Sequence, residues 1–156
     1  MTQLENSPRI APFLWYDQNA EEAVDFYLAV FKNSRRISEL RNPGPAPGAP
    51  GSILTIEFEL DGTRFTALNG GPAHKFNEAV SFFIRCESQA EIDYYWERLT
   101  DGGSEIACGW LRDKFGLCWQ VVPVNIGELV GNPGAMTAMM SMKKLDIAAL
   151  EQAGKN

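Results

Sequence analysis

The sequence predicts an α+β protein made of two tandem strand–helix–strand–strand–strand units. Two observations lead to this fold class. An apolar strand, a helix-capping pattern and an amphipathic helix occur twice in the same order, and alternating strands with tight turns follow each helix. The units should cover about residues 9–70 and 78–123, and added C-terminal helices about residues 124–153. With 156 residues, we expect a single domain over 1–156.

The first unit opens with an apolar strand over residues 10–16. Asn19 is a favourable N-cap residue, and Glu22 three positions later completes a capping-box pattern. The helix that follows has an apolar stripe with the spacing i, i+4, i+7 and i+8, formed by Ala23, Tyr27, Val30 and Phe31. These features predict a helix that begins directly after Asn19.

The second unit repeats this order from a strand over residues 79–86. Ser88 and Glu91 form the same capping-box pattern, and Gly102-Gly103 ends the helix. Its apolar stripe consists of Ile92, Tyr95, Trp96 and Leu99. Superimposing the two stretches pairs Asn19 with Ser88, Glu22 with Glu91 and Tyr27 with Trp96. We therefore interpret the chain as an internal duplication.

The segments after the helices predict strands and a helical tail. Residues 52–60 alternate between apolar and polar, and Asp61-Gly62 is a hairpin turn leading into a strand over 64–69. In the second unit a turn over 113–116 precedes a last strand over 117–122. Beyond it we expect short helices over 126–130 and 135–145, and a last helix from an Asp146 cap to Gln152.

Composition excludes several classes of function. The net charge of −6 disfavours a nucleic-acid partner, because phosphates would be repelled. No apolar run approaches the length of a membrane helix, and residues 1–9 lack the apolar core of a signal peptide. Cys86, Cys108 and Cys118 lack metal-site spacing, so we expect free thiols and a cytoplasmic location.

Several sequence motifs resemble one known family. They are Phe13-Leu-Trp-Tyr, Glu22-Ala-Val-Asp-Phe-Tyr, Ala67-Leu-Asn-Gly-Gly, Phe76-Asn-Glu-Ala-Val-Ser-Phe, and Cys108-Gly-Trp-Leu-Arg-Asp-Lys-Phe-Gly followed by Trp119-Gln120. Together with the duplication, they are similar to the PhnB-like family, also labelled the 3-demethylubiquinone-9 3-methyltransferase domain. This family falls in the vicinal-oxygen-chelate superfamily of glyoxalases, bleomycin-resistance proteins and dioxygenases.

The resemblance implies a curved half-barrel sheet around a cavity and a homodimer. Metal-binding members of the superfamily place ligands at positions that correspond here to Pro12, Ser81, Asn69 and Gln120. Only Gln120 is a residue type that those enzymes use, so we expect no metal and no cofactor. The methyltransferase label lacks its own motif, since no glycine-rich turn joins an apolar strand to a helix.

The candidate site residues are those that would face the implied cavity. Asn69, Ser81 and Gln120 would orient a ligand. Aromatic residues would form the walls, although many aromatic side chains simply belong to a core; they are Trp15, Phe76, Trp110, Phe115 and Trp119. Cys108 and His74 are weaker candidates for a catalytic nucleophile and base, without an evident third group.

Three functions remain open on this reasoning. The first is a metal-independent binding protein for an apolar or aromatic small molecule. The second is a metal-dependent isomerase, lyase or dioxygenase of the superfamily type, and the third is a structural or partner-binding dimer. Because the metal ligands are missing, we favour the binding protein; whether the chain turns over a substrate is left open.

Overall fold

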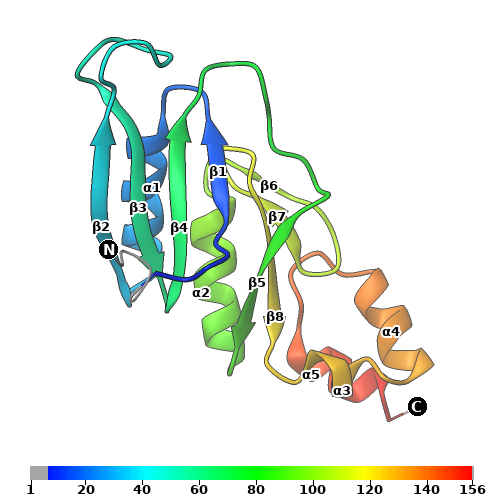
Figure 1. Cartoon of the computed structure of the whole chain (residues 1–156). Coiled ribbons are helices and arrows are strands. Elements are labelled where there is room, and N and C mark those ends of the chain that lie inside the picture. The colour runs from blue at the N-terminus through cyan, green and yellow to red at the C-terminus, as the bar shows by residue number, and fades with distance from the viewer. Residues whose placement is uncertain (1–6, 156) are drawn as a thin grey trace. The chain divides into compact units, whose positions relative to one another are not determined.

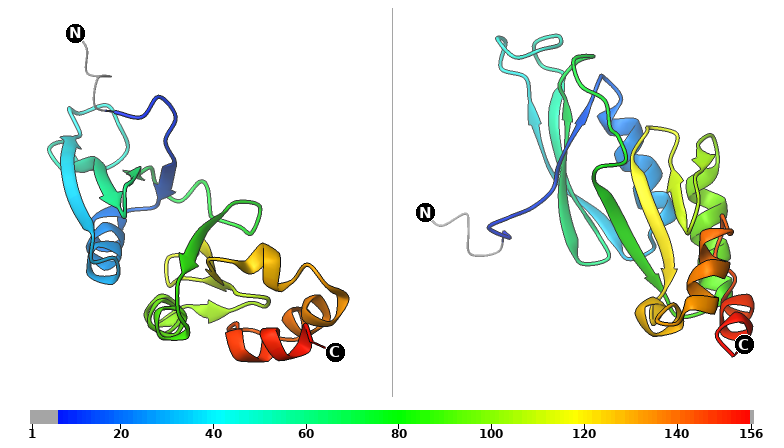
Figure 2. Two further views of the ribbon diagram at one scale, coloured as in Figure 1. Left: turned by 90° about the horizontal axis from the view of Figure 1, so that it is seen from below. Right: turned by 90° about the vertical axis from the view of Figure 1, so that its right-hand side faces the viewer.

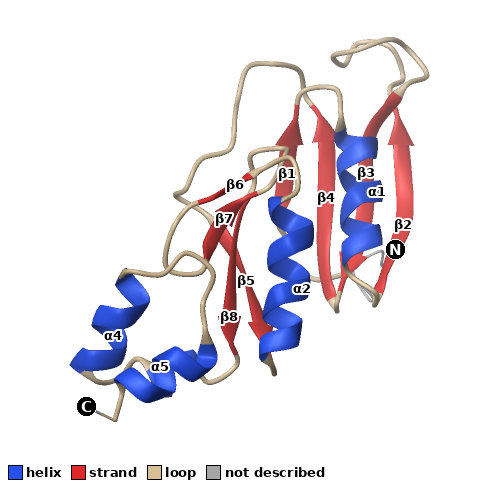
Figure 3. Ribbon diagram, turned by 180° about the vertical axis from the view of Figure 1, so that it is seen from behind, coloured by secondary structure: helices blue, strands red, loops and turns tan. Residues whose placement is uncertain are grey.

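The computed structural model describes residues 7–155, and the chain divides into two compact units. Unit 1 ends at Lys75 and unit 2 begins at Phe76. Each unit has one four-stranded sheet with one long helix against it (Figure 3). Unit 2 carries three further helices after its last strand (Figure 1). The predicted α+β class is therefore confirmed.

Unit 1 contains β1 (Phe13–Tyr16), α1 (Ala20–Val30), β2 (Ser34–Arg41), β3 (Ile53–Leu60) and β4 (Thr63–Asn69). The strand order in its sheet, called sheet A, is β1-β4-β3-β2. The β1–β4 pair is parallel, and the other two pairs are antiparallel. The hairpin between β3 and β4 turns at Asp61-Gly62, both in the left-handed region of φ, which is the conformation that this turn sequence favours.

Unit 2 repeats this topology with β5 (Ser81–Cys86), α2 (Gln89–Thr100), β6 (Ser104–Glu105), β7 (Trp110–Arg112) and β8 (Cys118–Pro123). The strand order in its sheet, called sheet B, is β5-β8-β7-β6, and the first pair is again parallel. Two units with the same element order and the same sheet order are what an internal duplication produces. The strand–helix–strand–strand–strand prediction holds for both.

The strand that sequence patterns missed in unit 1 is β2. Its sequence, Ser-Arg-Arg-Ile-Ser-Glu-Leu-Arg, lacks apolar alternation because β2 is an edge strand whose residues are half-buried or exposed. Charged residues on such a strand keep it from pairing with another chain. In unit 2, β6 has two residues and β7 three, too few to leave a period-2 signal.

The helix α1 covers one face of sheet A (Figure 2), and the core of unit 1 lies between this helix and the sheet. Val24 and Tyr27 are fully buried, and the ring of Tyr27 stacks on Phe58 of β3. The predicted N-cap contact is wrong, however, because Asn19 caps no N–H with its side chain. Asn69 at the end of β4 accepts the first helical N–H, that of Ala20, instead.

The helix α2 begins as predicted. Ser88 has the extended conformation of an N-cap, and its hydroxyl accepts the N–H of Glu91 at 3.2 Å. The Glu91 carboxylate reaches back to the N–H of Glu87, one residue before the expected Ser88. The buried residues of α2 are Ile92, Trp96 and Leu99, three of the four in the predicted stripe.

The tail of unit 2 forms α3 (Ile126–Leu129), α4 (Pro133–Met140) and α5 (Ile147–Ala153) around a small core with Val122. The Asp146 cap is confirmed, since its carboxylate accepts the N–H of Ala149. The helix predicted over 135–145 instead begins at Pro133 and ends at Met140. The segment after it binds the chain elsewhere, because the carbonyls of Met142 and Lys143 accept the N–H groups of Cys108 and Gly109.

Among the described residues, no helix combines the length and hydrophobicity needed to cross a bilayer.

Candidate functional site

The two faces of sheet B differ, and side-chain contacts with α2 tell them apart. Glu105 of β6 accepts the indole N–H of Trp96 in α2 at 2.7 Å. Cross-strand pairing continues from Glu105 to Leu111 and then to Trp119, whose ring lies 5.7 Å from that of Phe82. Because paired residues share a face, this row marks the side that α2 covers.

The opposite side of sheet B, called the open face because Phe83 and Arg85 are exposed on it, carries the neighbouring residues of each strand. At Val122, which pairs with Arg85, this face packs against the tail helices. One row crosses it from Phe83 through Gln120 to Trp110. The adjacent row contains Ser81, Cys118 and Arg112. Glutamine in the first row therefore lies between two aromatic residues, one on each neighbouring strand.

Gln120 and Ser81 are joined directly. The Gln120 amide nitrogen donates to the Ser81 hydroxyl at 2.9 Å, and both residues are half-buried. Among residues 7–155, no N–H or O–H donates to the remaining Gln120 carbonyl oxygen. The Ser81 hydroxyl accepts this bond and retains its own proton as a donor. The pair thus presents an acceptor and a donor beside two aromatic residues, which is the composition of a small-ligand site.

The turn before β8 has a different role, and it accounts for Trp119. Asp113 is 2% exposed, and its carboxylate accepts hydrogen bonds from the N–H groups of Phe115 and Leu117 and from the indole N–H of Trp119. Trp119 lies on the α2 side of the sheet and is 3% exposed, so it belongs to the core. The prediction of Asp113 as a turn residue is confirmed.

Phe115 and Phe76 are half-buried residues near the same turn. Lys114 places its ammonium 5.5 Å from the Phe115 ring centre. Phe76 lies beside Gly116: a Cβ atom at position 116 would be 3.9 Å from the Cβ of Phe76. Gly116 has a φ of 93°, which closes the turn at no steric cost.

In unit 1, Trp15 holds the segment that follows β4. Its indole N–H donates to the carbonyl of Gly71 at 2.9 Å, and its ring meets that of His74 edge-on, with centroids 4.7 Å apart. Gly70 lies directly against the ring: a Cβ there would come within 2.5 Å of it. Trp15 and His74 thus pack together in unit 1, whereas Cys108 belongs to unit 2.

Asn69, the third predicted polar site residue, has a structural place. It is 8% exposed and lies in register with Tyr16 on the α1 side of sheet A. Its amide oxygen accepts the N–H of Ala20 at 2.8 Å, and its amide nitrogen donates to the carbonyl of Ile53 at 3.0 Å. Both ends of the amide are therefore engaged by main-chain groups of unit 1.

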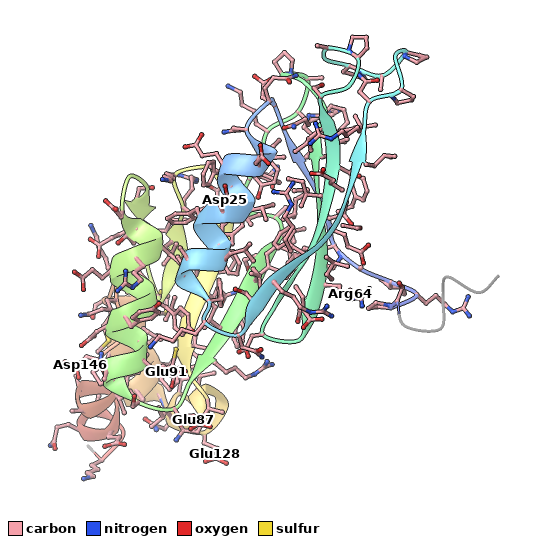
Figure 4. The ribbon with its side chains drawn as sticks, turned by 90° about the vertical axis from the view of Figure 1, so that its left-hand side faces the viewer. Asp25, Arg64, Glu87, Glu91, Glu128 and Asp146 are labelled. Atoms are coloured by element: carbon pink, nitrogen blue, oxygen red, sulfur yellow. The ribbon has the colours of Figure 1, made fainter. Side chains whose placement is uncertain are left out.

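The open face of sheet A, opposite α1, carries opposite charges in contact. Arg64, labelled in Figure 4, lies 2.9 Å from Glu57 and 3.9 Å from Glu59. Arg35 adds a second cation to Glu59 at 3.4 Å. Glu57 and Glu59 are therefore both paired with arginines.

The three cysteines are free thiols. Burial raises the pKa of Cys86 to about 12, and the charge of Glu91 adds to the shift. Burial also raises the pKa of Cys118, partly opposed by the charge of Arg112. Both thiols are thus poor nucleophiles near neutral pH. Cys108 is half-buried and has a φ of 55°, unusual for a residue other than glycine.

The side chains present do not fit the metal that the superfamily's name implies. Of the four corresponding positions, Pro12 offers no side-chain ligand and Asn69 is committed to the backbone. Ser81 and Gln120 are bonded to each other and carry no formal charge. Among residues 7–155, no three His, Cys, Asp or Glu side chains gather as a metal site would need.

Three open-face residues were not singled out in the sequence. Phe83 and Arg85 follow Ser81 at a spacing of two, and Arg85 lies over the Phe83 ring at 5.2 Å. Arg112 forms an ion pair with Glu78. Period-2 alternation along β5 was the signal that could have placed Phe83 and Arg85 with Ser81.

The duplicated units, with a helix on one face of each sheet, define the vicinal-oxygen-chelate class of fold. The chain belongs to the PhnB-like family described as 3-demethylubiquinone-9 3-methyltransferase, whose model matches residues 8–122. The family and superfamily predicted by resemblance are thereby confirmed.

Solved structures of similar proteins agree with this assignment. The PhnB protein from Bacillus cereus is 30% identical to this chain. The match covers 74% of this chain and 99% of the Bacillus cereus protein, with a TM-score of 0.65. The protein PA1353 from Pseudomonas aeruginosa is 21% identical over 75% of this chain and 98% of its own, with a TM-score of 0.60.

The fosfomycin resistance protein FosX from Mesorhizobium loti shares the fold at 14% identity. It covers 81% of this chain and 98% of its own, with a TM-score of 0.54. No curated protein matches the chain.

Proposed function

We propose that the chain is a metal-independent binding protein for a small apolar or aromatic molecule, held on the open face of sheet B. The observation that carries this proposal is the Gln120–Ser81 hydrogen bond of 2.9 Å in a row with Phe83 and Trp110. A flat apolar ligand would pack against the two rings, and a polar group on it would bind the Gln120 carbonyl or the Ser81 hydroxyl.

Metal independence is supported by the donor set. A transition-metal site needs several imidazole, thiolate or carboxylate ligands, and the open face of sheet B supplies an amide, a hydroxyl and a buried thiol of raised pKa. The amide and hydroxyl remain useful for orienting a neutral polar group, which they do without the cost of burying a charge.

The family description names a methyltransferase, and the local structure gives that activity little support. The turn from β1 to α1 is Asp17-Gln18-Asn19, and the turn from β5 to α2 is Glu87-Ser88. Neither contains the glycines that bring a backbone close to a nucleotide-type cofactor. We therefore base the proposal on the open face of sheet B and not on the family's description.

A thermal-shift screen with a panel of aromatic compounds tests the proposal. A ligand at one hundred times its Kd should stabilise the protein by about 2.7 kcal/mol, a rise in Tm of about 5–10 °C for a chain of this length. Gln120→Ala and Phe83→Ala should abolish the rise. Gln152→Ala is the matched control, since Gln152 is an exposed residue of α5 away from the site.

Two results would contradict the proposal. One is a panel in which no compound raises the Tm of the unmodified protein. The other is a rise that survives in Gln120→Ala and Phe83→Ala as fully as in the control. A rise that disappears after treatment with a chelator would retain the ligand but reject its metal independence.

A further inference from the structure

We infer that the ligand of the open face of sheet B is an aromatic carboxylate, bound through Arg85; this rests on the proposed function. Strands β5, β7 and β8 of that sheet have the sequences Ser-Phe-Phe-Ile-Arg-Cys, Trp-Leu-Arg and Cys-Trp-Gln-Val-Val-Pro. They contain two arginines and no acidic residue, in a chain whose net charge is −6. An arginine without an acidic partner on this face favours an anionic ligand.

The two arginines are not equivalent. Arg112 is paired with Glu78 and also contacts the Cys118 thiol, so its charge is largely compensated. Arg85 is exposed and lies over the Phe83 ring at 5.2 Å, and it makes no ion pair with any residue from 7 to 155. The contact with Phe83 holds the guanidinium beside the aromatic row while leaving its N–H groups available.

The spacing of the sheet sets the size of the ligand. Neighbouring strands lie about 4.8 Å apart, so Phe83 and Trp110, with Gln120 between them, are separated by roughly 10 Å. Arg85 is two residues beyond Phe83, about 7 Å along the strand. A bicyclic aromatic body fits against the row, and a carboxylate at its end reaches Arg85.

Calorimetric titration with three naphthalene probes tests the inference: 2-naphthoate, its isostere 2-naphthamide, and 2-(aminomethyl)naphthalene. Their groups carry negative, neutral and positive charge on the same ring system. We expect naphthoate to bind about fivefold more tightly than naphthamide, the gain of one partly exposed charge pair, and the amine to bind most weakly. Arg85→Gln should reduce the affinity for naphthoate to that for naphthamide and leave naphthamide unchanged.

Arg98→Gln is the matched control, because Arg98 lies over the Tyr94 ring in α2, at 4.5 Å, and not on the open face. The inference is overturned if naphthamide binds as tightly as naphthoate, or if Arg85→Gln weakens both probes equally. If either result occurs but Phe83→Ala still abolishes the binding of naphthamide, the inference about Arg85 fails and the proposed function stands. Failure of all three probes would overturn the inference, and the thermal-shift screen would then decide the proposed function separately.

Discussion

The amide oxygen of Asn69 accepts the N–H of Ala20 across 49 residues, so the end of β4 caps the start of α1. The same side chain donates to the carbonyl of Ile53 in β3. One buried amide therefore joins a helix and two strands of unit 1. A polar residue in this place stabilises the fold, since without it a buried N–H and a carbonyl would lack partners.

Replacing Asn69 by leucine should therefore destabilise the protein. Leucine has a similar size but satisfies neither main-chain group, and each unsatisfied buried group costs about 1–3 kcal/mol. We expect the free energy of unfolding in urea to fall by about 2–4 kcal/mol. Asn77→Ala is the control with a change below about 1 kcal/mol, because the Asn77 bond to the N–H of Ala79 is exposed. Equal effects would show that the Asn69 bonds add little.

Substitution of Asp113 should destabilise the protein more than substitution of an ordinary turn residue. Asp113→Asn keeps the oxygen that accepts from Phe115 and Leu117 but can set an amide N–H against that of Trp119. We expect a loss of about 2 kcal/mol in the asparagine variant and a larger one in Asp113→Ala, which removes all three bonds. Trp119 emission would shift to longer wavelength if the indole becomes hydrated. An alanine variant as stable as the asparagine variant would contradict this ordering.

The stability of the protein at alkaline pH should depend on Cys86. Its pKa is raised from 9.0 to about 12 in the folded protein, so the unfolded chain loses this proton first as the pH rises. Above about pH 9 the unfolded state binds fewer protons, and the free energy of unfolding should fall by about 1.4 kcal/mol per pH unit. Urea titrations at pH 9 and 10.5 should show a smaller decline in Cys86→Ala. Parallel declines in the two proteins would refute this.

The sequence predicts the duplicated topology because two helices with the same apolar stripe are strong local signals. Ser88 is correctly placed as a cap for the same reason, since its partner is three residues away. Asn19 has an equally good local pattern, but the first N–H of α1, that of Ala20, donates to Asn69. Asn69 lies in β4, 49 residues further along the chain. Local patterns cannot anticipate such a long-range partner. Asn69 is a candidate site residue only through its correspondence to a superfamily ligand position, which does not show that its amide binds the main chain.

The site is predictable to the extent that it follows strand alternation. The resemblance to the superfamily implies that Ser81 and Gln120 face the cavity, and their bond joins neighbouring strands of sheet B. Trp119, next in sequence to Gln120, points to the α2 side and binds Asp113. Aromatic character did not reveal this, because the face of a residue depends on the register of its strand, and a shift of one position exchanges core and open face.

We propose that a small aromatic molecule binds over Gln120 and its neighbours on the open face of sheet B. The most direct measurement is a two-dimensional ¹H–¹⁵N NMR titration of the labelled protein with 2-naphthoate. We predict that the side-chain amide of Gln120, the indole N–H of Trp110 and the backbone amides of Ser81 and Phe83 shift together, while the indole N–H of Trp119 moves least. Saturating shifts confined to other parts of the chain, or no shifts at millimolar ligand, would contradict the claim.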